Sequence, residues 1–189
     1  TPVIGLLGIV DDLVRRPPGA TLVDGHRLAL LGPPDVSLSG SLWGATRDAR
    51  GGVLAPLDLG LHQRVVDLVR GLVVSGRVDG VHDVSAGGLG VAIAEMVSRS
   101  GVGAHLARVD DHRALFGEGP SRVVLVVDPE CLSDVLAAAE AAAVPTTRIG
   151  LATGDRLIVK GLLDVSVDDV VAAHTDRLPE ALGAGTTNR

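Results

Sequence analysis

The order of patterns along the chain predicts an α/β protein of the α+β type, with a mixed sheet flanked by helices. Short runs rich in valine, leucine and isoleucine alternate with longer segments whose apolar residues recur at helical spacing. Near the C-terminal end, two such runs are separated only by a tight turn, which is typical of antiparallel strands. Alternating strands and helices with one late hairpin indicate a mixed sheet covered by helices.

The first twenty residues differ from the rest of the chain. Residues 1–10 are β-branched and leucine-rich without helical periodicity, which predicts a strand, and the connecting letters RRPPGAT follow. We expect residues 1–20 to be this strand and a linker, residues 21–182 to form one domain, and residues 183–189 to be a disordered tail. Within the domain, the first predicted strand covers 26–31 and ends at the turn-forming GPPD.

A long amphipathic helix is predicted after Pro56, with Asp58 as its N-cap and Gly76 at its end. His62 is expected on the flank of this helix, because no second histidine or carboxylate accompanies it at metal-binding spacing. The predicted buried stripe consists of Leu61, Val65, Leu68 and Leu72.

Residues 81–101 combine a buried strand, a polar turn and an amphipathic helix without interruption. Ser85 is the predicted cap of the helix, which Gly87 and Gly88 open. The pattern stops at Gly101, where the helix is expected to end. The predicted core-facing stripe is Leu89, Ile93, Met96 and Val97.

The turn at Gly87 and Gly88 permits two interpretations. A helix N-terminus with adjacent glycines lets an anion approach backbone N–H groups closely, so the turn is suited to phosphate binding. The alternative is a well-capped turn whose glycines serve only tight packing.

Further elements complete the predicted sheet and its helices. Strands are expected at 102–107, 147–152 and 156–159, and the turn TGD joins the last two as a hairpin. A continuous apolar strand precedes Asp128, where Asp–Pro marks a helix start, and Ser166 caps the last predicted helix.

Composition excludes several classes of function. A net charge of −6 and a pI near 5.4 argue against a nucleic-acid or acidic-membrane binder, because such proteins need a cationic field. Trp43 and Phe116 are the only aromatic residues, so platforms for base stacking are absent. No apolar run spans a bilayer and no leader is recognisable, so we expect a cytoplasmic protein. Cys131, the only cysteine, is expected to be buried and inert.

Two stretches carry a specific family resemblance. HDVSAGGLGVAIAEM resembles the HDVSDGGL-ALAEM motif in the C-terminal domains of phosphoribosylformylglycinamidine synthase, which is related to aminoimidazole ribonucleotide (AIR) synthetase and selenophosphate synthetase. Ala86 stands where that family usually has an acidic residue. FGEGPSR resembles FGES-Q-SR, with Gly119 and Pro120 where serine and glutamine are common. The matching residues are Phe116, Gly117, Glu118, Ser121 and Arg122.

A third stretch, SLSGSLWG, resembles the family's GGSEY-like loop, with Gly40 and Ser41 at matching positions. Leu42 and Trp43 replace the usual acidic and aromatic pair. A loop anchored by a buried Trp43 is at least as good an interpretation as a substrate contact.

The resemblance implies a C-terminal domain of the AIR-synthetase type, with a mixed, partly ferredoxin-like sheet. It also implies part of an enzyme that amidates formylglycinamide ribonucleotide to formylglycinamidine ribonucleotide with ATP and glutamine-derived ammonia, in purine biosynthesis. ATP and Mg²⁺ are implied for the intact enzyme, and neither is implied for this chain alone. The implied partners are an ATP-binding domain of which residues 1–20 are the tail, the remaining synthetase domains, a glutaminase and small accessory subunits.

The resemblance implies no catalytic and no metal-binding residue in this chain. Glu118 and Arg122 are suited to reading a ligand or to an ion pair that closes a loop. Ser85, Gly87, Gly88 and Arg122 are expected to line one concave surface. The implied substrate- or nucleotide-binding residues are His82, Asp83, Ser85, Gly87, Gly88, Gly117, Glu118, Ser121 and Arg122.

Two other functions stay open. GEGP in place of the usual sequence suggests a second domain copy, which holds an auxiliary nucleotide in a structural or regulatory role. A related synthetase is the other alternative, although AIR synthetase typically shows an HITGGG-like turn where this chain has VSAGG. The chain has no Walker loop, HExxH or CxxC motif, and we expect it to be inactive in isolation. The pair His82 and Asp83 is the one acid–base candidate, and adjacent strand residues point to opposite faces.

Overall fold

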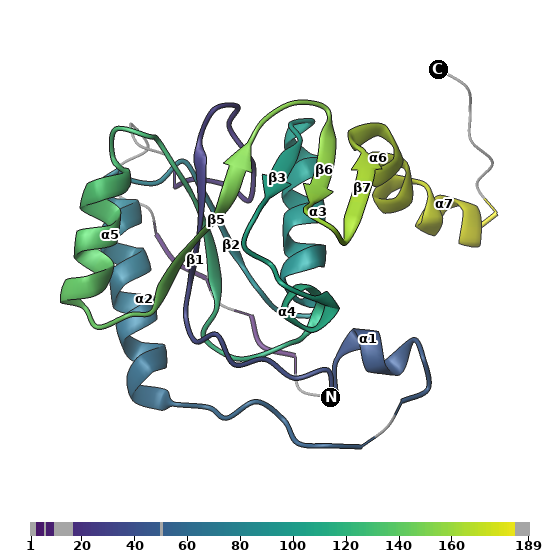
Figure 1. Cartoon of the computed structure of the whole chain (residues 1–189), viewed down its shortest axis with the longest axis horizontal. Helices are drawn as coiled ribbons and strands as arrows, with labels where there is room; N and C mark the ends of the chain where they lie inside the picture. Colours follow the sequence, from purple (N-terminus) through teal and green to yellow (C-terminus); the bar gives the residue numbers. More distant parts are fainter. Residues whose placement is uncertain (1–2, 6, 10–16, 50, 184–189) are drawn as a thin grey trace.

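The structure is a computed structural model that describes residues 3–5, 7–9, 17–49 and 51–183, and it contains one mixed sheet with helices on both faces (Figure 1). The described part forms seven strands in the order β2-β4-β1-β5-β3-β6-β7. This arrangement confirms the predicted mixed α/β class. The strands are β1 (Arg27–Leu31), β2 (Gly80–Asp83), β3 (Ala104–Leu106), β4 (Val123–Val127), β5 (Thr146–Ala152), β6 (Arg156–Val159) and β7 (Leu163–Ser166). The helices are α1 (Leu42–Ala45), α2 (Leu59–Val74), α3 (Gly88–Ser100), α4 (His112–Phe116), α5 (Leu132–Ala141), α6 (Val167–Thr175) and α7 (Arg177–Ala181).

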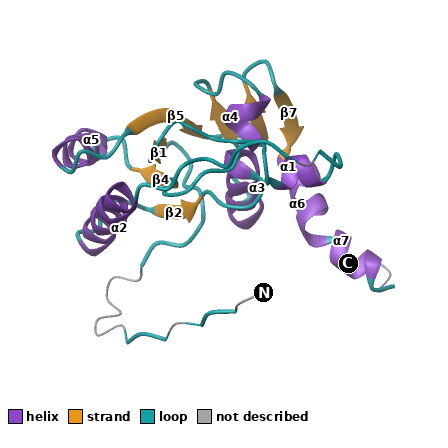
Figure 2. Ribbon diagram, turned by 90° about the horizontal axis from the view of Figure 1, so that it is seen from below, coloured by secondary structure: helices purple, strands orange, loops and turns teal. Residues whose placement is uncertain are grey.

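One half of the sheet has a ferredoxin-like arrangement. The units β1-α2-β2 and β4-α5-β5 interleave as β2-β4-β1-β5, and all three pairings are antiparallel. Figure 2 shows α2 and α5 together on one face of this half, with α3 on the other. The segment with α3, β3 and α4 lies between the two units in the sequence, and it extends the sheet beyond β5. The partial ferredoxin likeness is therefore confirmed.

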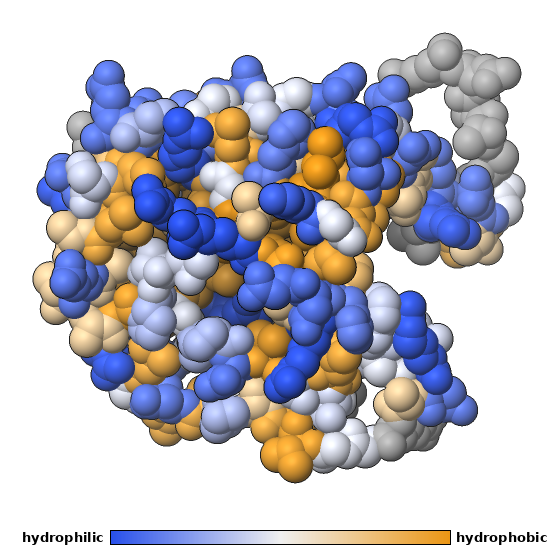
Figure 3. All heavy atoms as spheres, viewed as in Figure 1, coloured by the Kyte–Doolittle hydropathy of each residue, from blue (hydrophilic) through white to orange (hydrophobic). Residues whose placement is uncertain are grey.

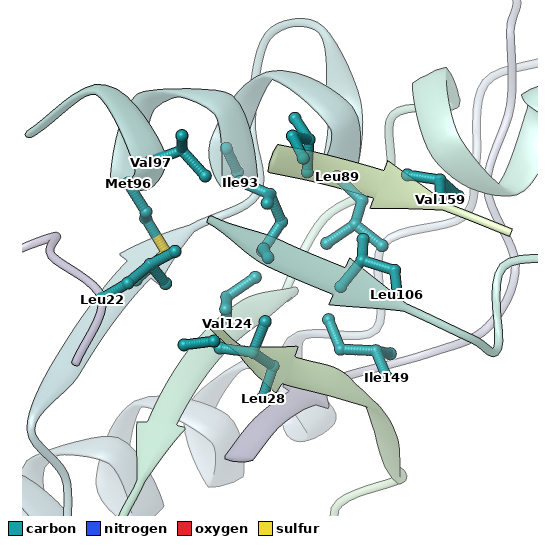
Figure 4. Close-up of a cluster of buried hydrophobic side chains, with 14 of the residues drawn as sticks. Leu22, Leu28, Leu89, Ile93, Met96, Val97, Leu106, Val124, Ile149 and Val159 are labelled. Atoms are coloured by element: carbon teal, nitrogen blue, oxygen red, sulfur yellow. The ribbon is translucent and has the colours of Figure 1, made fainter. Parts of the chain in front are cut away.

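Period-two alternation divides the strands between two hydrophobic cores. Leu28 and Val124 face α3, whereas Ala29 and Leu125 face α2 and α5. Each fully buried leucine contributes about 1.5–3 kcal/mol of transfer free energy, so the two cores hold the sheet from both sides. Figure 4 shows the α3 side, where the labelled side chains are Leu22, Leu28, Leu89, Ile93, Met96, Val97, Leu106, Val124, Ile149 and Val159.

The predicted caps Asp58 and Ser166 and the two predicted buried stripes are confirmed, whereas the predicted Ser85 cap of α3 is not. Asp58 caps α2, its Oδ1 accepting from the Leu61 N–H at 2.9 Å, and Ser166 caps α6, its Oγ accepting from the Asp169 N–H at 3.1 Å. Helix α3 ends at Gly101 with φ of +69°, as predicted. The predicted stripes of α2 and α3 are all buried: Leu61, Val65, Leu68, Leu72, Leu89, Ile93, Met96 and Val97.

The predicted hairpin of 147–152 with 156–159 is wrong. Strand β3 lies between β5 and β6, antiparallel to the first and parallel to the second. The cause is non-local: the TGD turn bonds to the start of β3, with the Thr153 N–H donating to Gly103 O at 2.8 Å and the Gly103 N–H donating to Gly154 O at 2.7 Å. The real hairpin joins β6 to β7, a strand that the sequence pattern did not reveal.

The described residues of the first ten form no strand. Residues 3–5 and 7–9 are exposed and without secondary structure, because no strand of the described sheet pairs with them. Their assignment to a preceding domain stays a prediction. Residues 1–2, 6 and 10–16 lie outside the described residues, as do residues 184–189 of the expected disordered tail.

Two details near Asp128 also differ from expectation. The helix begins at Leu132, three residues after Pro129, because Asp128 forms a turn in which its Oδ1 accepts from the Glu130 N–H at 2.7 Å. Cys131 is half-buried at the N-cap of α5, whereas the sequence predicted burial within the helix. Across the described chain, no helix combines the length and apolarity needed to cross a membrane.

Candidate functional site

A cavity of about 710 Å³ lies where three loops meet at one end of the sheet. The loop between α1 and α2 forms one wall together with the start of α2 and the residues just before α1. The β2–α3 turn forms a second wall, and the loop before β4 forms a third. The first wall is apolar and exposed, and Figure 3 shows hydrophobic residues along the lower rim, where Figure 1 draws this loop. The cavity is lined by Ser39, Gly40, Leu54, Ala55, Leu57, Leu59, His62, Asp83, Val84, Ser85, Ala86, Glu118, Gly119, Pro120, Ser121 and Arg122.

The β2–α3 turn is built differently from the predicted Ser85 cap. Gly87 is the N-cap, with φ of +83°, and it offers no side-chain hydrogen bond. The Gly88 N–H donates to Ser85 O at 3.0 Å, so Ser85 contributes its carbonyl group to the turn. Two successive left-handed residues reverse the chain before α3, and this geometry moves the Ser85 side chain to the cavity wall.

The glycines of the two motifs pack against each other behind the cavity. A Cβ added at Gly88 would lie 2.7 Å from Gly117 O and 2.8 Å from the carbonyl carbon of Phe116. Gly117 is buried as well, and a Cβ there would overlap Val36 at 2.7 Å. Neither Gly87, Gly88 nor Gly117 lines the cavity. For these glycines, the packing interpretation of the turn agrees with the geometry.

Glu118 ties together the N-termini of α1 and α3. Its Oε1 accepts from the Leu42 N–H at 2.7 Å and from the Gly87 N–H at 2.8 Å. Its backbone pairs with Ser37 in an isolated bridge. A carboxylate is favourable beside helix N-termini because these carry partial positive charge. The donor that could have met a phosphate at Gly87 is therefore already occupied, and Glu118 forms no ion pair with Arg122.

Arg122 is the group in the cavity whose bonding is incomplete. The residue is only 5% exposed, and its Nε and Nη1 have no hydrogen-bond partner among the described residues. Burial lowers the pKa of the Arg122 guanidinium below its usual value. Its backbone is fixed, since Arg122 O accepts from the Val84 N–H at 2.9 Å. A buried cation without a partner costs several kcal/mol, so an anionic ligand is the natural complement of this site.

Ser121 and His62 complete the polar part of the cavity. Ser121 has a φ of +63°, which is uncommon for a residue with a side chain, and its Oγ lies 3.0 Å from Nδ1 of His62. Gly32 permits this conformation, because a Cβ at Gly32 would overlap the Ser121 carbonyl oxygen. The sequence predicted His62 as a flank residue, and no local pattern pointed to its contact with a loop far along the chain.

His82 lies outside the cavity, whereas Asp83 lines it. The Nε2 of His82 is 2.9 Å from Glu95 Oε2 and 3.3 Å from Arg99 Nη1, on the side of α3. The two side chains thus lie on different sides of the strand, as expected for adjacent residues, although Nδ1 of His82 and Oδ1 of Asp83 approach to 3.3 Å without hydrogen-bond geometry. The mostly exposed Asp83 carboxylate is free to turn back toward its neighbour.

The described residues do not form a magnesium site. Asp83 and Glu118 both line the cavity, but the Oε1 of Glu118 is engaged by two N–H groups. Within the described ranges, no group of three histidine, cysteine, aspartate or glutamate residues is placed to hold a metal ion. Hard cations such as Mg²⁺ need several oxygen ligands, and this cavity does not supply them.

Trp43 anchors the α1 segment beside the site. Its ring stacks on Phe116 with centroids 4.6 Å apart, and the Arg47 guanidinium lies 3.3 Å from the centre of the Trp43 ring. Trp43 does not line the cavity. Its loop holds α1 against the α4 end, in agreement with the anchoring interpretation, but Trp43 is half-buried, whereas the sequence predicted burial.

Sequence comparisons identify relatives over almost the whole chain. Residues 23–161 match the family model "AIR synthase related protein, C-terminal domain". Phosphoribosylformylglycinamidine synthase subunit PurL of Nocardioides sp. is 38% identical over 185 residues, which cover 97% of this chain and 24% of that subunit. The PurL subunit of Methylocella silvestris is also 38% identical, covering 97% of this chain and 26% of its own length. The chain thus spans about a quarter of the curated relatives that it matches.

Solved structures agree on the fold. Thermotoga maritima PurL complexed with FGAR has a TM-score of 0.68 at 18% identity, over 82% of this chain and 29% of that one. The same protein complexed with ATP has a TM-score of 0.67 at 16% identity, over 84% and 28% of the two chains. The matching family model covers both motifs and most of the sheet, and the chain belongs to the family of AIR synthase related proteins, as their C-terminal domain.

Proposed function

We propose that the chain serves as one domain of an ATP-dependent phosphoribosylformylglycinamidine synthase, in purine biosynthesis. That enzyme amidates formylglycinamide ribonucleotide with ammonia derived from glutamine. The observation that carries the proposal is the cavity at the junction of the β2–α3 turn and the Phe116–Arg122 loop, because both motifs build it and it contains an unpaired buried Arg122. Relatives that share 38% of the sequence are named as subunits of this synthase, which supports the same role.

Within the proposed site, the motif residues divide into two groups. Asp83, Ser85, Glu118, Ser121 and Arg122 line the cavity and face a ligand. The other four hold the loops in place, through the His82 contacts with α3 and through close glycine packing. That second group is His82, Gly87, Gly88 and Gly117.

The cofactors and partners of the proposed enzyme lie largely outside this chain. ATP is part of the proposal because a fold neighbour is described in complex with it, and Mg²⁺ would be held by other domains. The proposed partners are an ATP-binding domain, a glutaminase and small accessory subunits, and another fold neighbour is described as PurLQS. We place this assembly in the cytoplasm.

The test is a chimera of the Nocardioides PurL subunit in which this chain replaces the matching quarter. The chimera should restore purine-independent growth to a strain that lacks the subunit, and purified chimera should form ADP only with formylglycinamide ribonucleotide and an ammonia source. The isolated chain should give no ADP above background. Turnover by the isolated chain, or a soluble chimera without activity, would contradict the proposal.

A second candidate is favoured by Gly119 and Pro120, which stand in the cavity wall where relatives of this motif carry polar residues. In this version the domain holds an auxiliary nucleotide while another copy performs the chemistry. The chimera separates the two candidates. If the domain holds an auxiliary nucleotide, Arg122→Met should reduce the amount of nucleotide that copurifies with the chimera and should lower the stability of the assembly. Turnover per assembled enzyme should then stay unchanged.

A further inference from the structure

We propose that the cavity binds the phosphate end of its ligand on the Arg122 guanidinium and the Ser121 hydroxyl, and not on the N-terminus of α3. The site therefore takes phosphate monoesters. The assignment rests on the proposed function only in treating this cavity as the ligand site. The bonding state of each donor in the cavity decides where the anion lies.

The N-terminus of α3 is excluded by its own hydrogen bonds. The Gly87 N–H donates to Glu118 Oε1 at 2.8 Å, and the Gly88 N–H donates to Ser85 O at 3.0 Å. A phosphate at this point would have to displace a carboxylate of the same charge that also caps α1. Both donors lie behind the cavity wall, since neither glycine lines it.

The Arg122 side chain, in contrast, has donors that no acceptor satisfies. Its Nε and Nη1 are buried and unbonded among the described residues, so binding an anion forms charge-assisted hydrogen bonds without breaking existing ones in the protein. The side chain is enclosed by the protein, because only 5% of the residue is exposed, and the Val84 N–H holds its backbone in place. The desolvation cost is already present in the free protein, which favours the bound state.

Ser121 supplies an adjustable second donor. When Nδ1 of His62 carries the proton, the ring donates to Ser121 Oγ and the hydroxyl hydrogen is free for a phosphate oxygen. The left-handed conformation of Ser121 and the close approach of Gly32 fix the loop that carries both Ser121 and Arg122. The donors are thus held in position before the ligand arrives.

The negative groups in the cavity do not cancel this attraction. The Oε1 of Glu118 is compensated by two N–H donors, and the Asp83 side chain is 74% exposed, where water and salt screen its charge. A charge–charge interaction is stronger in a low effective dielectric, so the buried guanidinium dominates the local field. The apolar wall formed by Leu54, Leu57 and Leu59 is suited to the uncharged part of an ester.

The experiment is calorimetric titration of the purified chain with ribose 5-phosphate, inorganic phosphate and ribose, together with melting curves. Ribose 5-phosphate should bind more tightly than phosphate, and ribose should not bind. Arg122→Met should weaken ribose 5-phosphate binding by about tenfold or more while the ligand-free melting temperature stays equal or rises. Ser121→Gly retains the backbone conformation without the hydroxyl, and should weaken binding by about threefold to tenfold.

The matched control is Arg70→Met, at an exposed arginine on α2, which should bind as the unchanged chain does. Unchanged affinity in Arg122→Met, a lower ligand-free melting temperature in that variant, or no phosphate binding by the chain would each overturn the inference. An active chimera with a chain that fails to bind phosphate would remove this inference and leave the proposed function. Phosphate binding by the chain together with an inactive chimera would contradict the proposed function and leave this inference.

Discussion

The two polar walls of the cavity, the β2–α3 turn and the loop before β4, differ in whether their hydrogen-bond donors have acceptors within the protein. In the turn, the donors of Gly87 and Gly88 are satisfied by Glu118 and Ser85. In the loop, the stronger donor Arg122 is buried with two nitrogens unsatisfied. Satisfied donors hold a structure together, whereas unsatisfied buried ones reduce its stability unless a ligand arrives.

This difference changes the meaning of the glycine-rich motif. Adjacent glycines before a helix are suited to phosphate binding, but here the space at Gly88 is filled by the backbone of Phe116 and Gly117, and the space at Gly87 is filled by the side chain of Val91. The motif is thus a joint between two loops. Variants at four positions test this difference, and their expected effects on stability decrease in the order Gly88, Glu118, Ser121 and Gly71.

Gly88→Val should have the largest effect on stability. The substituent meets Gly117 O at 2.7 Å and Gly88 has a φ of +68°, so clash and strain add to a loss of about 3 kcal/mol or more. The melting temperature should fall by about 6 °C or more. Gly25→Val is the matched control, because Gly25 has a φ of +83° and open space around it, and it should lose only the strain component. Equal losses in the two variants would show that the loop contact at Gly88 is not tight.

Glu118→Ala should destabilise the chain by about 2 kcal/mol, because the N–H groups of Leu42 and Gly87 lose their shared acceptor. Glu118→Gln retains an acceptor oxygen and should lose less than half of that amount. Chemical denaturation of both variants measures the two free energies of unfolding. If alanine and glutamine cost the same, the carboxylate is not the joint between α1 and α3.

Local patterns predicted most of the helices and the alternation of the strands, because a stripe such as Leu61 to Leu72 and a cap such as Asp58 depend on neighbours within a few residues. The pairing of β3 between β5 and β6 was not predictable, since it depends on contacts between segments about 50 residues apart. The resemblance to a known family, and not residue periodicity, singled out Arg122 and Glu118.

The bonding state of the site residues could not be predicted from the sequence. Glu118 and Arg122 are four positions apart and of opposite charge, which suggested an ion pair, yet Glu118 accepts from two backbone N–H groups and Arg122 keeps two nitrogens without a partner. The contact of His62 with Ser121 joins residues 59 positions apart. Only the assembled loops decide which donors are satisfied, and this is the property that separates the two walls.

Ser121→Val should destabilise the chain by about 1–2 kcal/mol, because a β-branched residue is poorly tolerated at a φ of +63°. Ser121→Gly relieves the strain but loses the hydrogen bond to His62, and should change the free energy of unfolding by less than about 1 kcal/mol. Denaturant titration of the two variants separates backbone strain from hydroxyl chemistry. A valine variant as stable as the glycine variant would mean that the loop carrying Arg122 relaxes, and that its donors are not held in advance.

The smallest effect is expected at Gly71, a glycine inside α2 that faces open space and makes no close contact. Gly71→Ala should stabilise the chain by up to about 1 kcal/mol, because alanine restricts the unfolded chain and is the better helix former. The melting temperature should rise by about 2–4 °C, with ribose 5-phosphate affinity unchanged. A loss of stability there would mean that this surface is packed in solution. The opposite signs expected at Gly71 and Gly88 follow from what each missing Cβ would meet, and not from the residue type.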